Sequence, residues 1–527
     1  MTARIQFREA LDWRTAESLN RATLWGFIIL GILFRLRQYL FDRSLWLDES
    51  LLALNIIRRS PTELLKPLDH AQGAPIGFLW LEKLAVHSLG PGEMTLRLVP
   101  FLAGLGSIFL FVMVARRFLT PGAVLIAVAL FSFCSPLIYY SSEAKQYSID
   151  VAVALLLYLM SSPMLEFQLG TMRVIALSLA GAFAIWLSHP AAFVLAGMGL
   201  ISFWISTRKN EWRILLKICL VLTVWSCSFL VFYLVSLRTL SHSRNLLNYW
   251  NSAFAPFPLS SLANAKWYVE SFFGIFSYPV GLVFTGIAAV AAILGAIEIF
   301  AMDEGRCLLL VLPTALTLVA SWLHRYPFQG RLLLFIVPSA ILLIAAGLEI
   351  ISRKTRDSIP LLSPLAVGLL FLHPVADACL DFIKPHGVEE IRPAIQYVEA
   401  HGSEADLLYC YYSAAPSLEY YSLRGLNLPM KEVMGVESRQ NWQVYREDID
   451  KLRGHKRVWI LFSHVWSWSG VDERLLFLDY LDSIGKRLDN TQENGASAYL
   501  YDLSAPQSDA VGELNFKKET QNESSGR

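Results

Sequence analysis

Residues 98–140 read LVPFLAGLGSIFLFVMVARRFLTPGAVLIAVALFSFCSPLIYY, and the charged residues among them are Arg116 and Arg117. A helix that crosses about 30 Å of hydrocarbon needs roughly 20 mostly apolar residues. The two apolar runs on either side of the arginines therefore predict two membrane spans joined by a short charged turn.

The same pattern extends along most of the 527 residues. The chain is 54% hydrophobic and 17% charged, with a mean hydropathy of +0.44, which excludes a disordered chain, a coiled coil and a disulfide scaffold. We predict a polytopic α-helical membrane protein with eleven spans: 22–40, 94–114, 121–141, 148–164, 173–188, 190–206, 214–237, 273–299, 307–323, 331–351 and 358–376.

The basic residues predict the orientation. With residues 1–21 as a cytoplasmic leader, the short loops on the same side hold Arg116, Arg117, Arg208, Lys209, Arg213, Arg353, Lys354 and Arg356. This arrangement satisfies the positive-inside rule. The loop 41–93, the turn 142–147 and everything after 376 would then lie outside.

The region after the last span changes character. Residues 377–505 contain alternating apolar runs at 406–412, 457–463 and 497–503, with helical patterns between them. They predict a small extracytoplasmic α/β domain. We expect the polar tail 506–527 to be disordered. The sequence alone does not decide whether Cys379 and Cys410 form a disulfide.

The overall charge bears on the partners. The net charge of +1 comes from 45 basic and 44 acidic residues, so we expect no nucleic-acid partner. The lipid bilayer is the expected environment.

The first outer loop begins with two adjacent carboxylates, Asp48 and Glu49. One could remove a proton from a hydroxyl acceptor, and the other could orient the acceptor or bind a metal ion. Solvated loop charges or a helix N-terminus would give the same pattern. The rest of the loop predicts interfacial amphipathic helices, on which Lys83 could meet a lipid phosphate.

Two other outer turns carry charge at the membrane edge. Glu143 and Lys145 interrupt an apolar sequence beside Tyr147 and could hold a phosphate and a polar ring, although an aromatic belt with one ion pair fits too. Arg325 and Arg331 cluster at another edge, where arginine suits bidentate phosphate recognition or simple anchoring of the helix ends.

The order of these segments resembles a known family. A span, an outer loop opening with Asp-Glu, amphipathic helices, the segment PLIYYSSEAKQYS (136–148) and the segment GRLLL (330–334) together resemble the polyprenyl-phosphate-sugar-dependent glycosyltransferases of the GT-C fold. Relatives include protein O-mannosyltransferases, the aminoarabinose transferase for lipid A and lipid A galacturonosyltransferases. The stretch His70–Pro75 departs from the His-Pro-Pro of many relatives.

The resemblance implies roles for individual residues. Asp48 resembles the catalytic base, Glu49 its acceptor-orienting neighbour and Glu143 a second acidic residue of the site. Lys145, where relatives usually have arginine, and Arg331 resemble contacts of the donor phosphate. We also assign Tyr147, Arg325 and Lys83 to donor or substrate binding.

The resemblance also implies a reaction. A sugar would pass from a polyprenyl-phosphate donor to a hydroxyl of a lipid, glycan or protein by inverting single displacement, at the outer face of a bacterial inner membrane. No cofactor is certain and a divalent metal stays open. The alternatives are a transporter or flippase of a lipid-linked sugar, and a polymerase or ligase that uses diphosphate-linked glycans.

Overall fold

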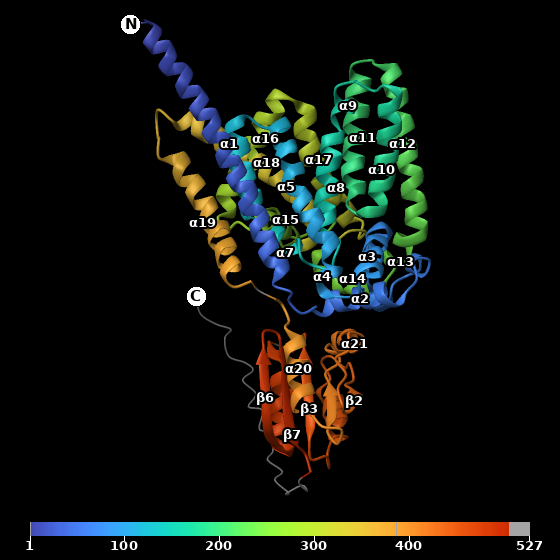
Figure 1. Cartoon of the computed structure of the whole chain (residues 1–527). Coiled ribbons are helices and arrows are strands. Elements are labelled where there is room, and N and C mark those ends of the chain that lie inside the picture. Colours follow the sequence, from blue (N-terminus) through green and yellow to red (C-terminus); the bar gives the residue numbers. More distant parts are fainter. Residues whose placement is uncertain (1, 386, 469, 505–527) are drawn as a thin grey trace, which may run out of the picture. The chain divides into compact units, whose positions relative to one another are not determined.

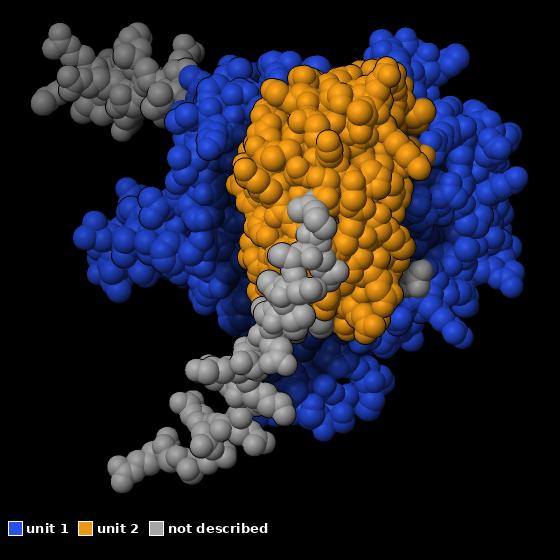
Figure 2. All heavy atoms as spheres, turned by 90° about the horizontal axis from the view of Figure 1, so that it is seen from below, with its two compact units in different colours: residues 1–387 blue, residues 388–527 orange. Residues whose placement is uncertain are grey.

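The computed structural model describes residues 2–385, 387–468 and 470–504. The chain forms two compact units, Met1–Gly387 and Val388–Arg527, which Figure 2 shows in different colours. The first unit is helical and the second contains a β-sheet (Figure 1). The tail 506–527, for which we expect disorder, lies outside the described residues.

Long apolar helices dominate the first unit. Within the described residues, nine are long and apolar enough to cross a membrane. They are α1 (Thr2–Leu40, apolar from Asn20), α5 (Leu98–Phe118), α8 with α9 (Tyr147–Met160, Ser162–Leu165), α11 (Ala191–Arg208), α12 with η3 and α13 (Trp212–Phe232, Tyr233–Leu237, Arg238–Leu240), α16 (Thr285–Met302), α17 (Glu304–Trp322), η5 with α18 (Gly330–Ile336, Val337–Thr355) and α19 (Leu362–Ile383). Two shorter apolar helices, α6 (Pro121–Phe133) and α10 (Thr171–Leu187), cover the remaining predicted spans.

Breaks near proline residues divide two of the predicted spans. The run 121–141 leaves the helix at Cys134 and resumes as α7 (Ser135–Tyr140), because Pro136 has no N–H and its ring would clash with the preceding helical turn. The run 273–299 is divided between α15 (Leu262–Ser277) and α16, with Pro279 in the break.

Short helices close one end of the first unit. The predicted helices of the first outer loop are present as α2 (Leu47–Arg58), η1 (Glu63–Leu65), η2 (Asp69–Ala71) and α3 (Ile76–Leu89), followed by α4 (Glu93–Leu96). They gather at the same end as α14 (Arg244–Tyr249) and η4 (Asn251–Ala253) (Figure 1). This end also receives the C-terminus of α1 and the start of α5.

Close packing fixes α18 against α16. A Cβ added at Gly295 would lie 1.9 Å from the carbonyl oxygen of Leu343, and one at Gly347 would lie 1.8 Å from that of Ala291. Small residues let the two backbones approach closely, as is common between membrane helices. Because η5 leads directly into α18, this contact helps to position Arg331.

The second unit confirms the predicted α/β domain. Its sheet has the order β2-β1-β3-β7-β6, in which β1 is parallel to β2 and β3 while β7 is antiparallel to β3 and β6. The strands are β1 (Leu407–Cys410), β2 (Lys431–Met434), β3 (Val458–Ser463), β6 (Lys486–Glu493) and β7 (Ala496–Asp502), with a small hairpin of β4 (Ser467–Trp468) and β5 (Val471–Asp472). The helices are α20 (Ile391–His401), α21 (Ala415–Leu423), α22 (Trp442–Asp450) and α23 (Glu473–Ile484).

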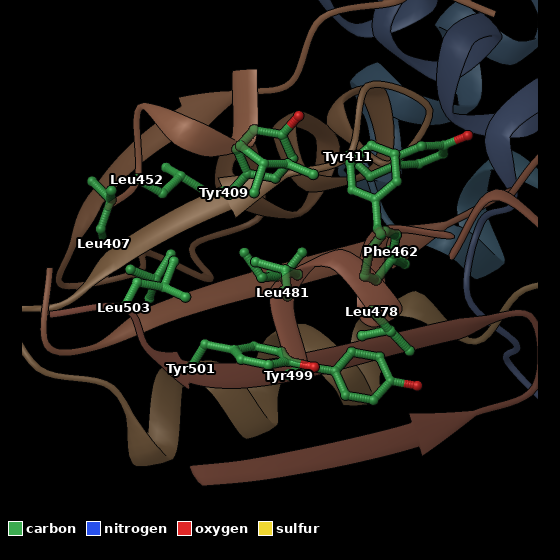
Figure 3. Packing of buried hydrophobic residues seen from close by; sticks show 14 of the residues in the cluster. Leu407, Tyr409, Tyr411, Leu452, Phe462, Leu478, Leu481, Tyr499, Tyr501 and Leu503 are labelled. Atoms are coloured by element: carbon green, nitrogen blue, oxygen red, sulfur yellow. The ribbon is translucent and has the colours of Figure 1, made fainter. Parts of the chain in front are cut away.

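Apolar and aromatic side chains fill the core of this unit (Figure 3). Tyr409 and Phe462 from the strands, with Tyr411 directly after β1, pack with Leu478 and Leu481 from α23. The edge strands β2 and β6 have mostly exposed residues, which is why no apolar run predicted them. The thiols of Cys379 and Cys410 are both free.

Candidate active site

The first two acidic residues of the site lie in the first turn of α2. Asp48 and Glu49 follow Trp46 and Leu47, where the helix begins. Carboxylates are favoured there because the first N–H groups of a helix have no partner within it. The two neighbours nevertheless point into different surroundings.

Glu49 is fully buried in an ion pair with Arg97. Nε of Arg97 donates to Oε1 at 2.9 Å, and Nη2 donates to Oε2 at 2.6 Å. The same guanidinium donates to the carbonyl oxygens of Arg43 and Ser44. The N–H of Ala144 donates to Oε1 of Glu49 at 2.7 Å. One carboxylate thus ties together α2, the start of α5 and the turn before α8.

The electrostatics keep Glu49 ionised. Burial alone would raise the pKa of Glu49, but the positive charges of Arg97 and Arg43 hold it below its ordinary value. A buried ion pair adds little net stability compared with an apolar pair of the same size. Its many hydrogen bonds instead hold the two side chains in one geometry. We therefore regard Glu49 as a fixed element of the site.

Glu143 lies in the turn before α8 and is also fully buried. Neither carboxylate oxygen has a hydrogen-bond partner among the described residues. Burial and the nearby charge of Glu49 raise the pKa of Glu143 to about 7, against the effects of Arg331, Arg43 and Lys145. A carboxyl group with this pKa can gain or lose a proton near neutral pH.

Lys145 is 5% exposed and donates to Oε1 of Gln72 at 2.7 Å. This hydrogen bond joins the turn before α8 to the first outer loop. Burial lowers the pKa of the ammonium group, and the nearby carboxylate of Asp48 opposes the change. The first outer loop and the turn before α8, which both belong to the family resemblance, are therefore in contact.

Asp48 forms an ion pair with Arg331, which comes from η5. The two side chains are 25% and 18% exposed, in contrast to the buried Glu49–Arg97 pair. The guanidinium of Arg331 lies over the ring of Trp46 at 5.2 Å and over that of Tyr147 at 5.7 Å. Asp48, Lys145, Tyr147 and Arg331 thus lie together.

Two arginines of the group were not predicted. Arg97 pairs with Glu49, and Arg43 donates from Nη1 to Oγ of Ser142 at 2.8 Å while lying over the ring of Tyr139. Nε and Nη2 of Arg43 are buried without a hydrogen-bond partner in the described part of the chain. Both arginines flank apolar runs, and a charge next to a span is the signal that would have identified them.

Two predicted binding residues lie apart from the group. Nζ of Lys83 donates to the carbonyl oxygens of Ile56 and Ile57 at 2.9 and 3.0 Å, where it caps the end of α2. Arg325 is exposed in the turn after α17. Neither side chain is joined to Asp48 or Glu143 by a contact between described residues.

The group combines opposite charges at one end of the first unit. It contains three carboxylates (Asp48, Glu49, Glu143) and four cations (Arg43, Arg97, Lys145, Arg331), so one positive charge is in excess when all are ionised. Such a site can accept an anionic ligand while it keeps a carboxylate for proton transfer. Among the residues described, no group of three His, Cys, Asp or Glu side chains could hold a metal ion.

Comparisons with known proteins gave matches among solved structures. No family model and no curated protein matches the chain. Two structures of ArnT from Cupriavidus metallidurans, in the apo state and bound to undecaprenyl phosphate, are each 14% identical and cover 92% of this chain and 99% of their own, with TM-scores of 0.49 and 0.47.

A second protein among these matches is the archaeal oligosaccharyltransferase AglB from Archaeoglobus fulgidus, in complex with an inhibitory peptide and a dolichol-phosphate. It is 11% identical over 90% of this chain and 74% of its own, with a TM-score of 0.49. The chain is thus similar in structure to ArnT and to AglB, among other solved structures.

Proposed function

We propose that this protein is a membrane glycosyltransferase that moves a sugar from a polyprenyl-phosphate donor to a hydroxyl acceptor. The observation that carries the proposal is the pairing of Asp48 with Arg331 beside Lys145. A carboxylate and two cations at one membrane edge meet the needs of the reaction, which are a base for the hydroxyl and positive charge for the leaving phosphate.

The proposed step is a single displacement. The oxygen of the acceptor hydroxyl attacks the anomeric carbon while its proton passes to the carboxylate of Asp48. The bond from the anomeric carbon to the phosphate oxygen breaks, and its electron pair leaves with the polyprenyl phosphate. Arg331 and Lys145 stabilise the charge that grows on this phosphate. One displacement inverts the anomeric centre.

The buried residues have a supporting role in this proposal. Glu49 and Arg97 hold the first turn of α2 against the turn before α8, and so they set the distance between Asp48 and Lys145. Tyr147 supports the guanidinium of Arg331 through its ring. Glu143, with its pKa near neutrality, adjusts the charge of the group. Lys83 and Arg325 have no role in the reaction as we propose it.

We propose that the candidate site faces the outside of a bacterial inner membrane, where the acceptor binds, and that the N-terminus lies in the cytoplasm. Arg117, Lys209 and Arg306 gather at the end of the helix unit opposite the candidate site, where α5 and α11 finish. Basic residues favour the cytoplasmic side. Labelling of a cysteine placed at Glu404 in a Cys379→Ser background tests this orientation, since protection from an impermeant reagent outside would contradict it.

A transfer assay tests the function directly. Purified protein is mixed with radiolabelled polyprenyl-phosphate sugars and a membrane lipid extract, and the wild type is compared with Asp48→Asn. We expect transfer from one donor and a loss of roughly 100- to 10,000-fold in the variant, the usual contribution of a general base. Asp69→Asn, which changes an exposed carboxylate of the same loop, is the matched control and should retain activity.

The same experiment separates the alternatives. Full activity of correctly folded Asp48→Asn would reject Asp48 as the base. Movement of lipid-linked sugar across liposomes without transfer would favour a flippase. Transfer only from diphosphate-linked glycans would favour a polymerase or ligase.

A further inference from the structure

The two acidic neighbours at the start of α2 differ in how firmly they are held. Glu49 accepts two hydrogen bonds from Arg97 and one from the backbone of Ala144, and it is fully buried. The Asp48–Arg331 pair is partly exposed. A ligand that enters the site therefore meets Asp48 and Arg331 before it meets the buried pair.

Arg331 has unused hydrogen-bonding capacity. Within the described part of the chain, Nη2 is the nitrogen of this guanidinium that donates a hydrogen bond, and it donates to Asp48. Nε and Nη1 are left to bind something else. The rings of Trp46 and Tyr147 lie against the guanidinium, so it can keep its position when its hydrogen-bond partner changes.

A phosphate and a carboxylate compete for such a guanidinium. Both accept two parallel hydrogen bonds from arginine in the same geometry. The phosphodiester of a polyprenyl-phosphate sugar carries one negative charge, and the phosphate gains a second when the sugar leaves. The carboxylate oxygen of Asp48 that accepts from Arg331 is meanwhile unavailable to a hydroxyl proton.

We propose that the donor phosphate displaces Asp48 from Arg331, and that Asp48 acts as a base only after this exchange. The inference rests on the proposed function and adds an order to it, in which the donor binds before the acceptor is activated. Lys145 lies close enough to Asp48 to interact with its charge, so the released carboxylate stays within the site.

The exchange has a consequence for binding. In the wild type, a polyprenyl phosphate must break the Asp48–Arg331 pair before it can bind Arg331. In Asp48→Asn the pair is absent, so the same ligand should bind roughly two- to fivefold more tightly, the equivalent of a partly exposed ion pair.

The experiment is calorimetric titration of the full-length protein in nanodiscs with farnesyl phosphate at pH 8. Farnesol, which has no phosphate, is the ligand control. Glu143→Gln is the matched variant, because it removes a negative charge that acts on Arg331 without a hydrogen bond to it. We expect clear tightening in Asp48→Asn and a smaller change in Glu143→Gln.

Each outcome has one meaning. Equal affinity in the wild type and Asp48→Asn, or equal tightening in both variants, would overturn the exchange and leave the glycosyltransferase proposal intact. No binding of farnesyl phosphate to any of the proteins would contradict the proposed function, and the exchange with it. If Asp48→Asn does not unfold like the wild type on heating, Asp48→Ser replaces it with the same expectation.

Discussion

Charged side chains gather at both ends of the helix unit, but the two ends bury them differently. At the end where α5 and α11 finish, charged residues including Arg117, Arg173, Asp303 and Arg306 line an open cavity of about 920 Å³. The Arg208–Glu304 pair there has side chains that are 61% and 40% exposed. At the other end, Glu49, Arg97 and Glu143 are almost completely removed from solvent.

The difference supports placing the proposed chemistry at the end with the buried charges. Exposed ion pairs contribute at most about 1 kcal/mol and occur on any charged surface. Buried charges cost several kcal/mol each unless they are compensated, so they persist where they have a purpose. We therefore identify the candidate site by the burial of its charges and not by the size of a cavity. The carboxyl group of Glu143, which has no hydrogen-bond partner among the described residues, belongs to this evidence.

Removal of Arg97 should have the largest effect on stability. Arg97→Met leaves Glu49 buried without its partner, and we expect a loss of about 3–5 kcal/mol in the free energy of unfolding. Denaturant or thermal unfolding in detergent measures this loss. The double variant Arg97→Met/Glu49→Leu should recover part of it, and failure to recover any would show that packing, not charge, was lost.

Glu143 should make stability depend on pH. Its pKa is about 7 in the folded protein and 4.5 ordinarily, so the folded state holds a proton that the unfolded state has lost. The free energy of unfolding therefore falls as pH rises from about 4.5 to 7 and is flat above.

Glu143→Gln removes this dependence. The variant should be more stable than the wild type at pH 8, by on the order of 1–3 kcal/mol, and nearly equal to it at pH 4.5. Thermal unfolding at the two pH values gives the comparison. A constant difference between the two proteins would contradict a raised pKa for this carboxyl group.

Lys145 should affect the use of the donor. Lys145→Ala removes a buried charge from the position proposed for the donor phosphate, and kcat/KM for the donor should fall roughly ten- to a hundredfold. Stability should change less than in Arg97→Met because Gln72 is an uncharged partner. If kcat/KM for the donor does not change, Lys145 does not contact the donor phosphate.

The smallest effect is expected at the opposite end. Arg208→Gln breaks the exposed pair with Glu304, and the free energy of unfolding should change by less than about 1 kcal/mol. Transfer activity should be unchanged. A loss of unfolding free energy as large as that of Arg97→Met would show that the two ends do not differ in how much their charges matter for stability.

The sequence predicted much of the fold because hydrophobic patterning is local. Every predicted span overlaps an apolar helix, and the apolar runs 406–412, 457–463 and 497–503 became strands. The errors occurred where a single residue interrupts the helix within a continuous apolar run, as Pro136 does in the third predicted span. The polar edge strand β6 was missed because its residues bury little surface.

Part of the candidate site can be read from the sequence for the same reason. Asp48, Glu143, Lys145 and Arg331 stand at the ends of apolar runs, where a charge is conspicuous. Lys83 was predicted from an amphipathic helix of the first outer loop, but its ammonium group caps α2. Sequence position does not distinguish a charge that binds a carbonyl group from one that could bind a ligand.

The sequence by itself determined the apolar helices, the loop that begins with Asp48 and Glu49, and the charges that end each run. Only the tertiary structure decided that Glu49 pairs with Arg97 and Asp48 with Arg331, which is 283 positions away in the chain. The physical reason is that a helix forms from neighbours three and four residues apart, whereas a buried charge finds its partner only when distant helices pack together.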